Sequence, residues 1–235
     1  MGAGRCALVM NLLLCLASLA SAATAVVAHV DFVRGDKSGG HARQMHPDSV
    51  VWLTPADPDH AQPPAPGSFV MTQHDKMFMP HLLVMPVGSS VSFPNRDPFF
   101  HNVFSFFNGR RFDLGLYQSG QSRSIVFNRA GISYIFCNIH PEMSAVIITL
   151  DTPYYGIADE NGAIHMAGVP PGAYWMHVWS EAIPPEAKQP APRRVTVVAD
   201  TDTDLGSIPI RIAGSLSEHL NKFGQPYDTH ASPAY

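Results

Sequence analysis

The segment at residues 137–143 contains three side chains that bind soft and borderline metal ions. Cys137, His140 and Met143 follow one another at C-x2-H-x2-M spacing, directly after an apolar run that predicts a buried strand. Copper takes thiolate, imidazole and thioether ligands, and a group of two His and one Cys with a weak axial Met is among its protein sites. Because a tight loop can direct three side chains to one ion, the segment predicts a copper site.

A site of this kind needs a second imidazole, and His101 is the candidate. It lies in segment 97–103, upstream of the predicted ligand loop. The alternative is that Cys137 is a small buried apolar residue, as lone Cys residues often are, and that the neighbouring histidines share no function. Three ligand types in one short segment, with a further His on an upstream strand, favour the metal site.

The four candidate ligands are expected to have different roles. We predict that His101, Cys137 and His140 form the equatorial plane and that Met143 is the axial ligand. The thiolate would supply the strongest bond, and the thioether a weak bond that tunes the reduction potential. Alternate residues of a strand share one face, so Cys137 is expected to point into the core together with Ile135.

Two motifs in the chain resemble those of the cupredoxins. They are Phe93-Pro94-Asn95-x-Asp97…His101-Asn102-Val103 and Cys137-x-x-His140-Pro141-x-Met143. The predicted ligand loop is similar in length to that of amicyanin and shorter than that of plastocyanin. With its C-terminal extension, the chain resembles the exported proteins known as methylamine utilisation proteins, in which a cupredoxin is joined to a small β domain. The resemblance covers about residues 65–213. It implies an all-β fold, a Greek-key cupredoxin β-sandwich with one type 1 copper.

The resemblance also implies supporting roles for residues beside the ligands. Asn102 is expected to tie the two ligand-bearing loops together through a hydrogen bond, unless it is a turn residue. An apolar patch around the exposed edge of His140 is expected to be the docking surface for a redox partner. The residues of this patch are Phe99, Phe100, Ile139 and Pro141. The two Phe side chains fit the core equally well.

These expectations indicate an exported type 1 copper protein that carries one electron between periplasmic partners, such as a c-type cytochrome or a quinoprotein dehydrogenase. The alternative is a copper-storing or structural protein without electron transfer. An enzyme is not expected, because copper oxidases and nitrite reductases need further clustered His and the sequence has no H-x-H pairs. Cys137 as a nucleophile would need exposure and a base aimed at it, which the ligand spacing does not favour.

The N-terminus has the pattern of a secretory signal peptide. Arg5 precedes an apolar run at residues 7–20, and two Ala-x-Ala cleavage sites follow, so we predict a signal peptide at residues 1–25. The run is short for a membrane span, and no span is expected after processing. Cys137 would then be the one remaining thiol, which favours a bound metal in an exported protein. The mature chain is expected in the periplasm or outside the cell.

Composition limits the classes of partner. Hydrophobic residues make up 46% of the chain and charged residues 14%, as in a globular protein, and the formal net charge is −4. No cluster of basic residues is present in the sequence, so nucleic acid is not an expected partner. A second copper site of the Met-rich type, built from His74, Met77, Met79, His81 and Met85, is a weaker alternative than ordinary packing of these residues.

The strand pattern predicts two β domains joined near Asp151. Residues 67–150 contain eight short apolar runs between turn residues, which is typical of the cupredoxin sandwich named above. Residues 151–213 resemble a small carboxypeptidase-regulatory, transthyretin-like β-sandwich domain. Residues 26–66 are expected to be an N-terminal strand segment and linker, and residues 214–235 a flexible tail.

Overall fold

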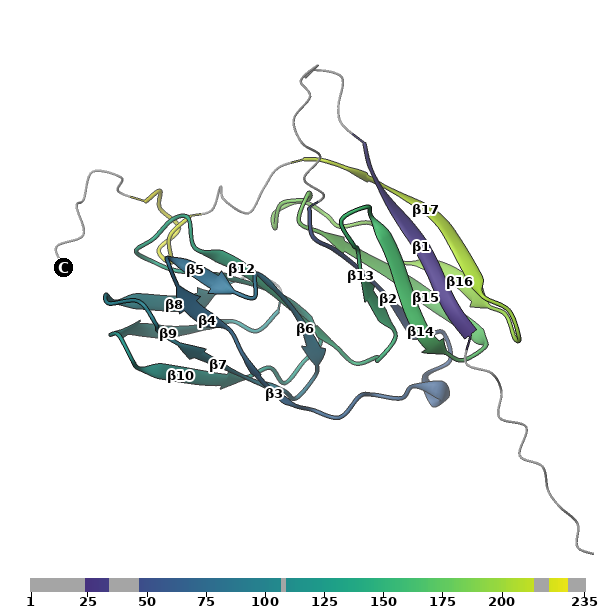
Figure 1. The fold of residues 1–235 in the computed structure, drawn as a ribbon, viewed down its shortest axis with the longest axis horizontal. Helices are drawn as coiled ribbons and strands as arrows, with labels where there is room; N and C mark the ends of the chain where they lie inside the picture. Colours follow the sequence, from purple (N-terminus) through teal and green to yellow (C-terminus); the bar gives the residue numbers. More distant parts are fainter. Residues whose placement is uncertain (1–23, 34–46, 107–108, 214–219, 228–235) are drawn as a thin grey trace, which may run out of the picture.

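The structure is a computed structural model that describes residues 24–33, 47–106, 109–213 and 220–227. Apart from a 3-10 turn at Pro58–His60, the regular elements of these residues are β-strands. The all-β prediction is therefore confirmed. The strands form two sandwiches that lie side by side, which we call the first and the second sandwich (Figure 1).

The first sandwich consists of two sheets and a short hairpin. Its strands are β3 (Ser68–Val70), β4 (Thr72–His74), β5 (Met77–Met79), β6 (Leu82–Pro86), β7 (Ser90–Pro94), β8 (His101–Ser105), β9 (Phe112–Tyr117), β10 (Ser122–Val126), β11 (Gly131–Phe136) and β12 (Ser144–Leu150). One sheet has the order β6-β12-β11-β8-β9 and the other the order β10-β7-β3, while β4 and β5 pair with each other. Two pairs of strands run parallel, β6 with β12 and β3 with β7.

The two sheets of the first sandwich enclose an apolar core. Val91 and Phe93 on β7 face Ile135 and Ile147 on β11 and β12, and all four are fully buried. Because side chains alternate between the faces of a strand, the same register also directs Cys137 into this core. The predicted ligand is therefore held at the end of a strand whose position is fixed by apolar packing.

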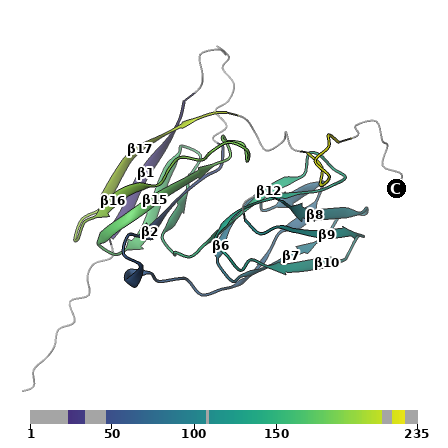
Figure 2. The ribbon, with the colours of Figure 1, turned by 180° about the vertical axis from the view of Figure 1, so that it is seen from behind.

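The second sandwich contains strands from both ends of the chain. Its strands are β1 (Thr24–Val33), β2 (Ser49–Pro55), β13 (Tyr155–Ile157), β14 (Ala163–Val169), β15 (Gly172–Ser180), β16 (Arg193–Val197) and β17 (Thr203–Arg211). They form the sheets β14-β1-β17 and β13-β2-β15-β16, which are visible from both sides in Figures 1 and 2. The core between these sheets includes Val26 and Val30 of β1 and Val51 and Leu53 of β2.

The position of the N-terminal strands differs from the sequence-based division of the chain. The sequence predicts an N-terminal strand segment and linker at residues 26–66 without assigning partners to its strands. In the structure β1 pairs with β14 and β17, and β2 lies between β13 and β15. The physical reason is that each strand has one apolar face and unpaired backbone groups, and the C-terminal strands satisfy both. The second sandwich therefore closes only when residues far apart in sequence come together.

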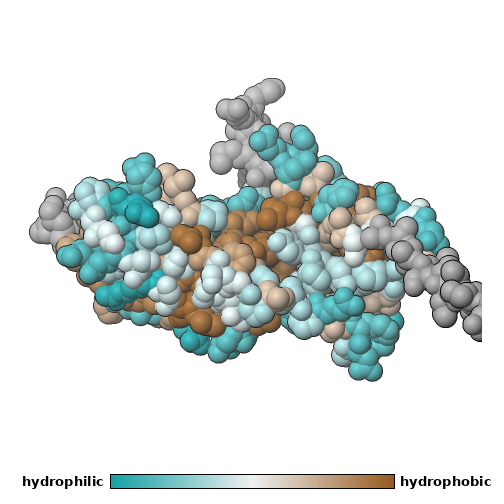
Figure 3. Space-filling view, turned by 60° about the horizontal axis from the view of Figure 1, so that its bottom comes forward, coloured by the Kyte–Doolittle hydropathy of each residue, from teal (hydrophilic) through white to brown (hydrophobic). Residues whose placement is uncertain are grey.

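A third apolar core joins the two sandwiches, and we call it the junction core. Val50 and Trp179, from β2 and β15, pack with Phe136, Val146 and Ile148 of the first sandwich. The strands β11 and β12 are consequently buried on both faces, with alternate residues in the two cores. On the face seen in Figure 3, apolar surface gathers toward the middle of the molecule, where the sandwiches meet.

The predicted signal peptide lies almost entirely outside the described residues, which begin at Thr24. The Thr24 hydroxyl donates to the carbonyl oxygen of Val169 at 3.0 Å, and Val26 is fully buried. Cleavage after Ala22 would keep β1 whole, whereas cleavage after Ala25 would remove its first paired residue. No helix within the described residues is long and apolar enough to cross a membrane.

Candidate metal centre

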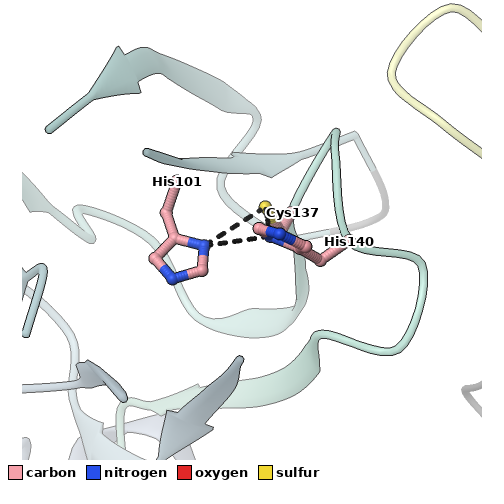
Figure 4. Close-up of side chains that lie close together, drawn as sticks. All are labelled: His101, Cys137 and His140. Atoms are coloured by element: carbon pink, nitrogen blue, oxygen red, sulfur yellow. Dashed lines mark hydrogen bonds between the residues drawn. The ribbon is translucent and has the colours of Figure 1, made fainter. Parts of the chain in front are cut away.

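Three of the four predicted ligands converge at one end of the first sandwich (Figure 4). The Nδ1 atoms of His101 and His140 are 3.1 Å apart. The Sγ atom of Cys137 lies 3.9 Å from His101 Nδ1 and 3.7 Å from His140 Nδ1. All three side chains are buried, and His140 is 6% exposed. The arrangement directs one sulfur and two ring nitrogens at the same point.

The ligand loop is closed by its own backbone. The N–H of Cys137 donates to the carbonyl of Met143 at 3.3 Å, and the N–H of Met143 donates to the carbonyl of His140 at 3.1 Å. The loop connects β11 to β12, and these strands pair from Gly131 with Thr149 to Phe136 with Ser144. These hydrogen bonds hold the thiol and the imidazole on the same side of a short turn.

Asp97 orients the ring of His101 from the side away from Cys137. Its Oδ2 accepts a hydrogen bond from His101 Nε2 at 2.7 Å, and the two carboxylate oxygens also accept the backbone N–H groups of Asp75 and Lys76. Burial opposes ionisation of this carboxyl, but the hydrogen bonds from Lys76, His101 and Asp75 hold its pKa below the usual value. The proton on Nε2 leaves Nδ1 with its lone pair toward Cys137.

The role of Asp97 was not predicted from the sequence, although the residue belongs to the first cupredoxin-like motif. The signal was its position four residues before His101, which places a carboxylate beside a His in the same loop. A carboxylate or carbonyl acceptor for the outer ring nitrogen is a general feature of histidines that bind metals. The presence of this acceptor is consistent with a metal-binding role of His101.

Burial determines the ionisation of all three converging groups. It lowers the pKa of His101, against the effect of the hydrogen bond to Asp97. Burial and the neighbouring His101 also lower the pKa of His140. Burial raises the pKa of the Cys137 thiol, although hydrogen bonds from the backbone oppose the shift. The imidazoles are therefore neutral at pH 7, and a nearby cation is needed to make the thiolate the stable form.

The separations fit a single metal ion. With the bond lengths of zinc to protein ligands, about 2.0–2.1 Å to nitrogen and 2.3 Å to sulfur, three ligands at equal angles in a plane would be separated by about 3.5–3.6 Å (nitrogen to nitrogen) and about 3.8 Å (sulfur to nitrogen). The observed sulfur-to-nitrogen distances of 3.9 and 3.7 Å match these values. The observed nitrogen-to-nitrogen distance of 3.1 Å is shorter and corresponds to an angle of about 95–102° between the two nitrogens at the metal. The donor set of two imidazoles and one thiol is the set that copper takes in His2Cys sites.

Met143 and Asn102 lie beside the converging ligands. Met143 is fully buried in the same core cluster as Cys137. The backbone of Asn102 hydrogen-bonds to the thiol of Cys137, while its side-chain Nδ2 donates to Asp113 Oδ1 at 2.7 Å. The backbone of Asn102 therefore connects β8 to the ligand loop, and its side chain connects β8 to β9 instead.

The residues predicted for partner docking surround the imidazoles unevenly. The Phe99 ring contacts both His101 and His140, with centroids 5.2 and 5.6 Å apart. Phe100 is 37% exposed. Ile139 and Pro141 are half-buried, and Ile139 packs against the core of the first sandwich. His140 itself is almost covered, with 6% of its surface exposed.

Part of the segment predicted as a flexible tail contacts the ligand loop. The Tyr227 hydroxyl donates to the backbone carbonyl of Cys137 at 2.7 Å. The backbone N–H of Lys222 donates to Asn138 Oδ1 at 3.0 Å, and its ammonium group pairs with Asp113 Oδ2 at 2.8 Å. This segment is the short yellow stretch beside the loops of the first sandwich in Figures 1 and 2. It had no sequence signal, because its partners are 84 to 109 residues away in the sequence.

We expect Tyr227→Phe to loosen the ligand loop without unfolding the protein. The substitution removes one hydrogen bond, which contributes about 0.5–1.5 kcal/mol to stability. Hydrogen exchange followed by mass spectrometry should show faster exchange in residues 137–143. Phe223→Ala is the matched control, since Phe223 lies in the same segment and is 72% exposed. Equal exchange in Tyr227→Phe and the unmodified protein would mean that the contact does not restrain the loop.

Solved structures of other proteins match parts of the chain at low similarity. No protein-family model matches the chain, and no curated protein matches it. A solved purple cupredoxin from Nitrosopumilus maritimus is 22% identical over 34% of this chain and 98% of its own, with a TM-score of 0.32. Amicyanin from Paracoccus versutus is 24% identical over 35% of this chain and 81% of its own, with a TM-score of 0.31.

A copper-containing nitrite reductase from Thermus scotoductus SA-01 also matches, with 24% identity over 51% of this chain and 28% of its own and a TM-score of 0.34. Similarities at this level carry no argument about the site, which rests on the geometry given above. The resemblance to methylamine utilisation proteins and the transthyretin-like character of the second sandwich stay predictions.

Proposed function

We propose that the protein is an exported type 1 copper protein that carries one electron at a time between redox partners. The observation that supports this most directly is the convergence of Cys137 Sγ with the Nδ1 atoms of His101 and His140 in a buried site. These three residues would hold copper, with Met143 as the axial ligand. The metal would supply one-electron redox chemistry between its cuprous and cupric forms.

The protein's contribution would be to hold the ligands still. Asp97 fixes the ring of His101, and the loop hydrogen bonds fix Cys137 and His140. The apolar core of the first sandwich surrounds the thiol and excludes water from it. Ligands held in one geometry would move little when the copper changes between Cu(II) and Cu(I). The apolar surroundings of the site, which exclude water, would affect the reduction potential of the copper.

The redox partner is proposed to dock over Phe99, Phe100, Ile139 and Pro141, as predicted from the sequence. Phe99 contacts both imidazoles, so a partner seated on this ring lies close to the ligands. Transient partners need a small apolar contact and fast release. A c-type cytochrome or a quinoprotein dehydrogenase in the periplasm would fit this role, and an enzymatic activity of the chain itself is not proposed.

A copper-storing protein without electron transfer is the second candidate. The observation that favours it is the cover over the site, since His140 is 6% exposed and Tyr227 binds the ligand loop. Electron transfer requires an accessible ligand edge, whereas storage does not. The two functions differ in whether the bound metal exchanges electrons with an external protein at a useful rate.

The test is a visible spectrum and metal analysis of the mature protein, followed by redox cycling. Type 1 copper predicts one copper per chain and an intense thiolate-to-Cu(II) absorption band, which disappears on reduction and returns on oxidation. Rapid exchange of electrons with a soluble c-type cytochrome would support the carrier. Bound copper without the band, or a band that no protein partner can bleach, would favour storage instead.

We expect Met143→Leu to retain copper and to raise the reduction potential. A thioether is a weak axial donor, and its loss destabilises Cu(II) relative to Cu(I). Leu has a volume similar to that of Met, so the buried position should be filled with little change in packing. Voltammetry of the variant and the unmodified protein measures the shift directly. A lowered potential, or a variant without copper, would mean that Met143 is not the axial ligand.

A further inference from the structure

A second group of candidate ligands lies away from Cys137, where the two sandwiches meet. It consists of Asp48, His81 and Glu181, whose ligand atoms all lie within 4.8 Å of one another. His81 Nε2 is 3.0 Å from Glu181 Oε1. The side chains of His81 and Glu181 are 39% and 22% exposed, so the group is partly covered and still open to water.

The three residues are held by both sandwiches. His81 precedes β6 of the first sandwich, and its backbone carbonyl accepts the N–H of Val146 at 2.8 Å. Asp48 precedes β2 and Glu181 follows β15, and the N–H of Glu181 donates to the carbonyl of Asp48 at 2.9 Å. Both carboxylates therefore come from the second sandwich, and the imidazole comes from the first.

The ring of His81 is oriented by a group outside this cluster. Its Nδ1 lies 3.0 Å from the carbonyl oxygen of Ser144, and a carbonyl oxygen can only accept, so Nδ1 carries a proton. The other nitrogen, Nε2, is directed at Glu181 Oε1, to which it donates a hydrogen bond, and a bound cation would replace the proton on Nε2. A backbone carbonyl on one ring nitrogen, with the other nitrogen directed at further ligands, is the arrangement found around histidines that bind metals.

Charge also favours a cation at this position. Two carboxylates face one imidazole, so a local charge of about −1 remains even when the ring is protonated. A divalent cation on Nε2 would neutralise both carboxylates.

We propose that Asp48, His81 and Glu181 bind a divalent cation of the zinc type, which joins the two sandwiches. One imidazole nitrogen and two carboxylate oxygens are borderline and hard ligands that Zn²⁺ accepts, and the partly open side leaves room for a water as the fourth. Two atoms about 2.0–2.1 Å from one tetrahedral ion would be about 3.3 Å apart. The observed 3.0 Å between Nε2 and Oε1 is a hydrogen-bond distance, and the two atoms would move apart by about 0.3 Å to bind one ion.

The consequence is a metal-dependent junction. A cation that binds only when both sandwiches are in place stabilises the folded chain in proportion to its concentration and affinity. This site contains no thiol, so it is chemically different from the group at Cys137. The inference does not depend on the proposed electron transfer, because it concerns other residues and another class of metal.

The experiment is a Zn²⁺ titration by calorimetry, using the mature full-length chain with Cys137→Ser and His140→Gln to disable the first site. One equivalent of Zn²⁺ should bind. Adding His81→Gln should lower the affinity for Zn²⁺ at least tenfold. Loss of a residue that only hydrogen-bonds to a metal ligand already lowers metal affinity by about 10–100-fold, and here the proposed ligand itself is removed. His60→Gln is the matched control, because His60 pairs with Asp57 at 3.0 Å on the open surface and should leave the affinity unchanged.

Glu181→Gln provides a second, nearly isosteric variant in case His81→Gln does not fold, as judged by circular dichroism. It should also weaken binding, and Zn²⁺ should raise the melting temperature of the disabled-site chain but not of this variant. The proposal is overturned if the disabled-site chain binds no Zn²⁺. It is equally overturned if binding is unaffected by both His81→Gln and Glu181→Gln, which would leave His81 and Glu181 as an ion pair alone.

Discussion

Cys137→Ser should remove the intense visible band that the proposed copper site predicts. The band requires a thiolate on Cu(II), and a hydroxyl oxygen is a harder and weaker donor than the sulfur it replaces. The fold should survive, because Ser is close to Cys in size and the strand register is fixed by neighbouring core residues such as Ile135 and Ile147. Burial of the hydroxyl at a fully covered position should cost about 1–3 kcal/mol of stability.

The measurement is the absorption spectrum after addition of one equivalent of Cu(II), together with the copper content after dialysis. Glu142→Gln is the matched control, since Glu142 lies in the same loop with an exposed side chain that is not a predicted ligand. The control should keep both the band and the copper. A Cys137→Ser protein that still shows the band would remove the copper–thiolate assignment and the proposed function with it.

The candidate ligands could be picked out from the sequence because the information is local. Cys137, His140 and Met143 lie in one loop, and the strand before the loop shows its register through alternating apolar residues. The structure brings Cys137 and His140 together with His101, the candidate from the upstream strand. Short spacing and strand periodicity are sufficient for this part, since both act over a few residues.

The surroundings of the site could not be predicted in the same way. Asp97 belongs to the first cupredoxin-like motif, but its hydrogen bond to His101 depends on how the loop between them folds. Tyr227 reaches Cys137 from ninety positions away in the sequence. The Tyr227 contact produces no periodic or compositional pattern, and the four-residue spacing of Asp97 and His101 does not by itself show that their side chains meet. Both affect how firmly the predicted ligands are held.

The pairing of the N-terminal strands was the largest departure from the expected organisation. The sequence shows that β1 and β2 are apolar. It does not show that the strands with which they pair come after the first sandwich in the chain. The position of Trp179 shows a similar limit. Trp179 lies on a predicted strand, and the alternation of side chains indicates that one face of this strand is buried. The sequence does not show that Trp179 packs against the first sandwich, which only the structure of the junction core reveals.

Trp179→Ala should therefore destabilise the protein more than any surface substitution. Trp179 is fully buried in the junction core, and its Nε1 donates to the Tyr134 hydroxyl at 3.0 Å. Removing a buried Trp side chain creates a cavity and costs about 3–5 kcal/mol. Urea unfolding followed by circular dichroism should show the loss. Trp175→Ala is the matched control on the same strand, where the side chain is 43% exposed, and should change stability by about 0.5 kcal/mol or less.

Hydrogen exchange can test whether the junction core is shared. Trp179 belongs to the second sandwich, yet it packs against Phe136, Val146 and Ile148 of the first. Its truncation should therefore accelerate exchange in β12 as well as in β15, because the cavity opens between them. Faster exchange confined to the second sandwich would mean that the first is stable without the junction. In that case the two sandwiches would fold as independent units, and the cation site at Asp48, His81 and Glu181 would gain importance as the link between them.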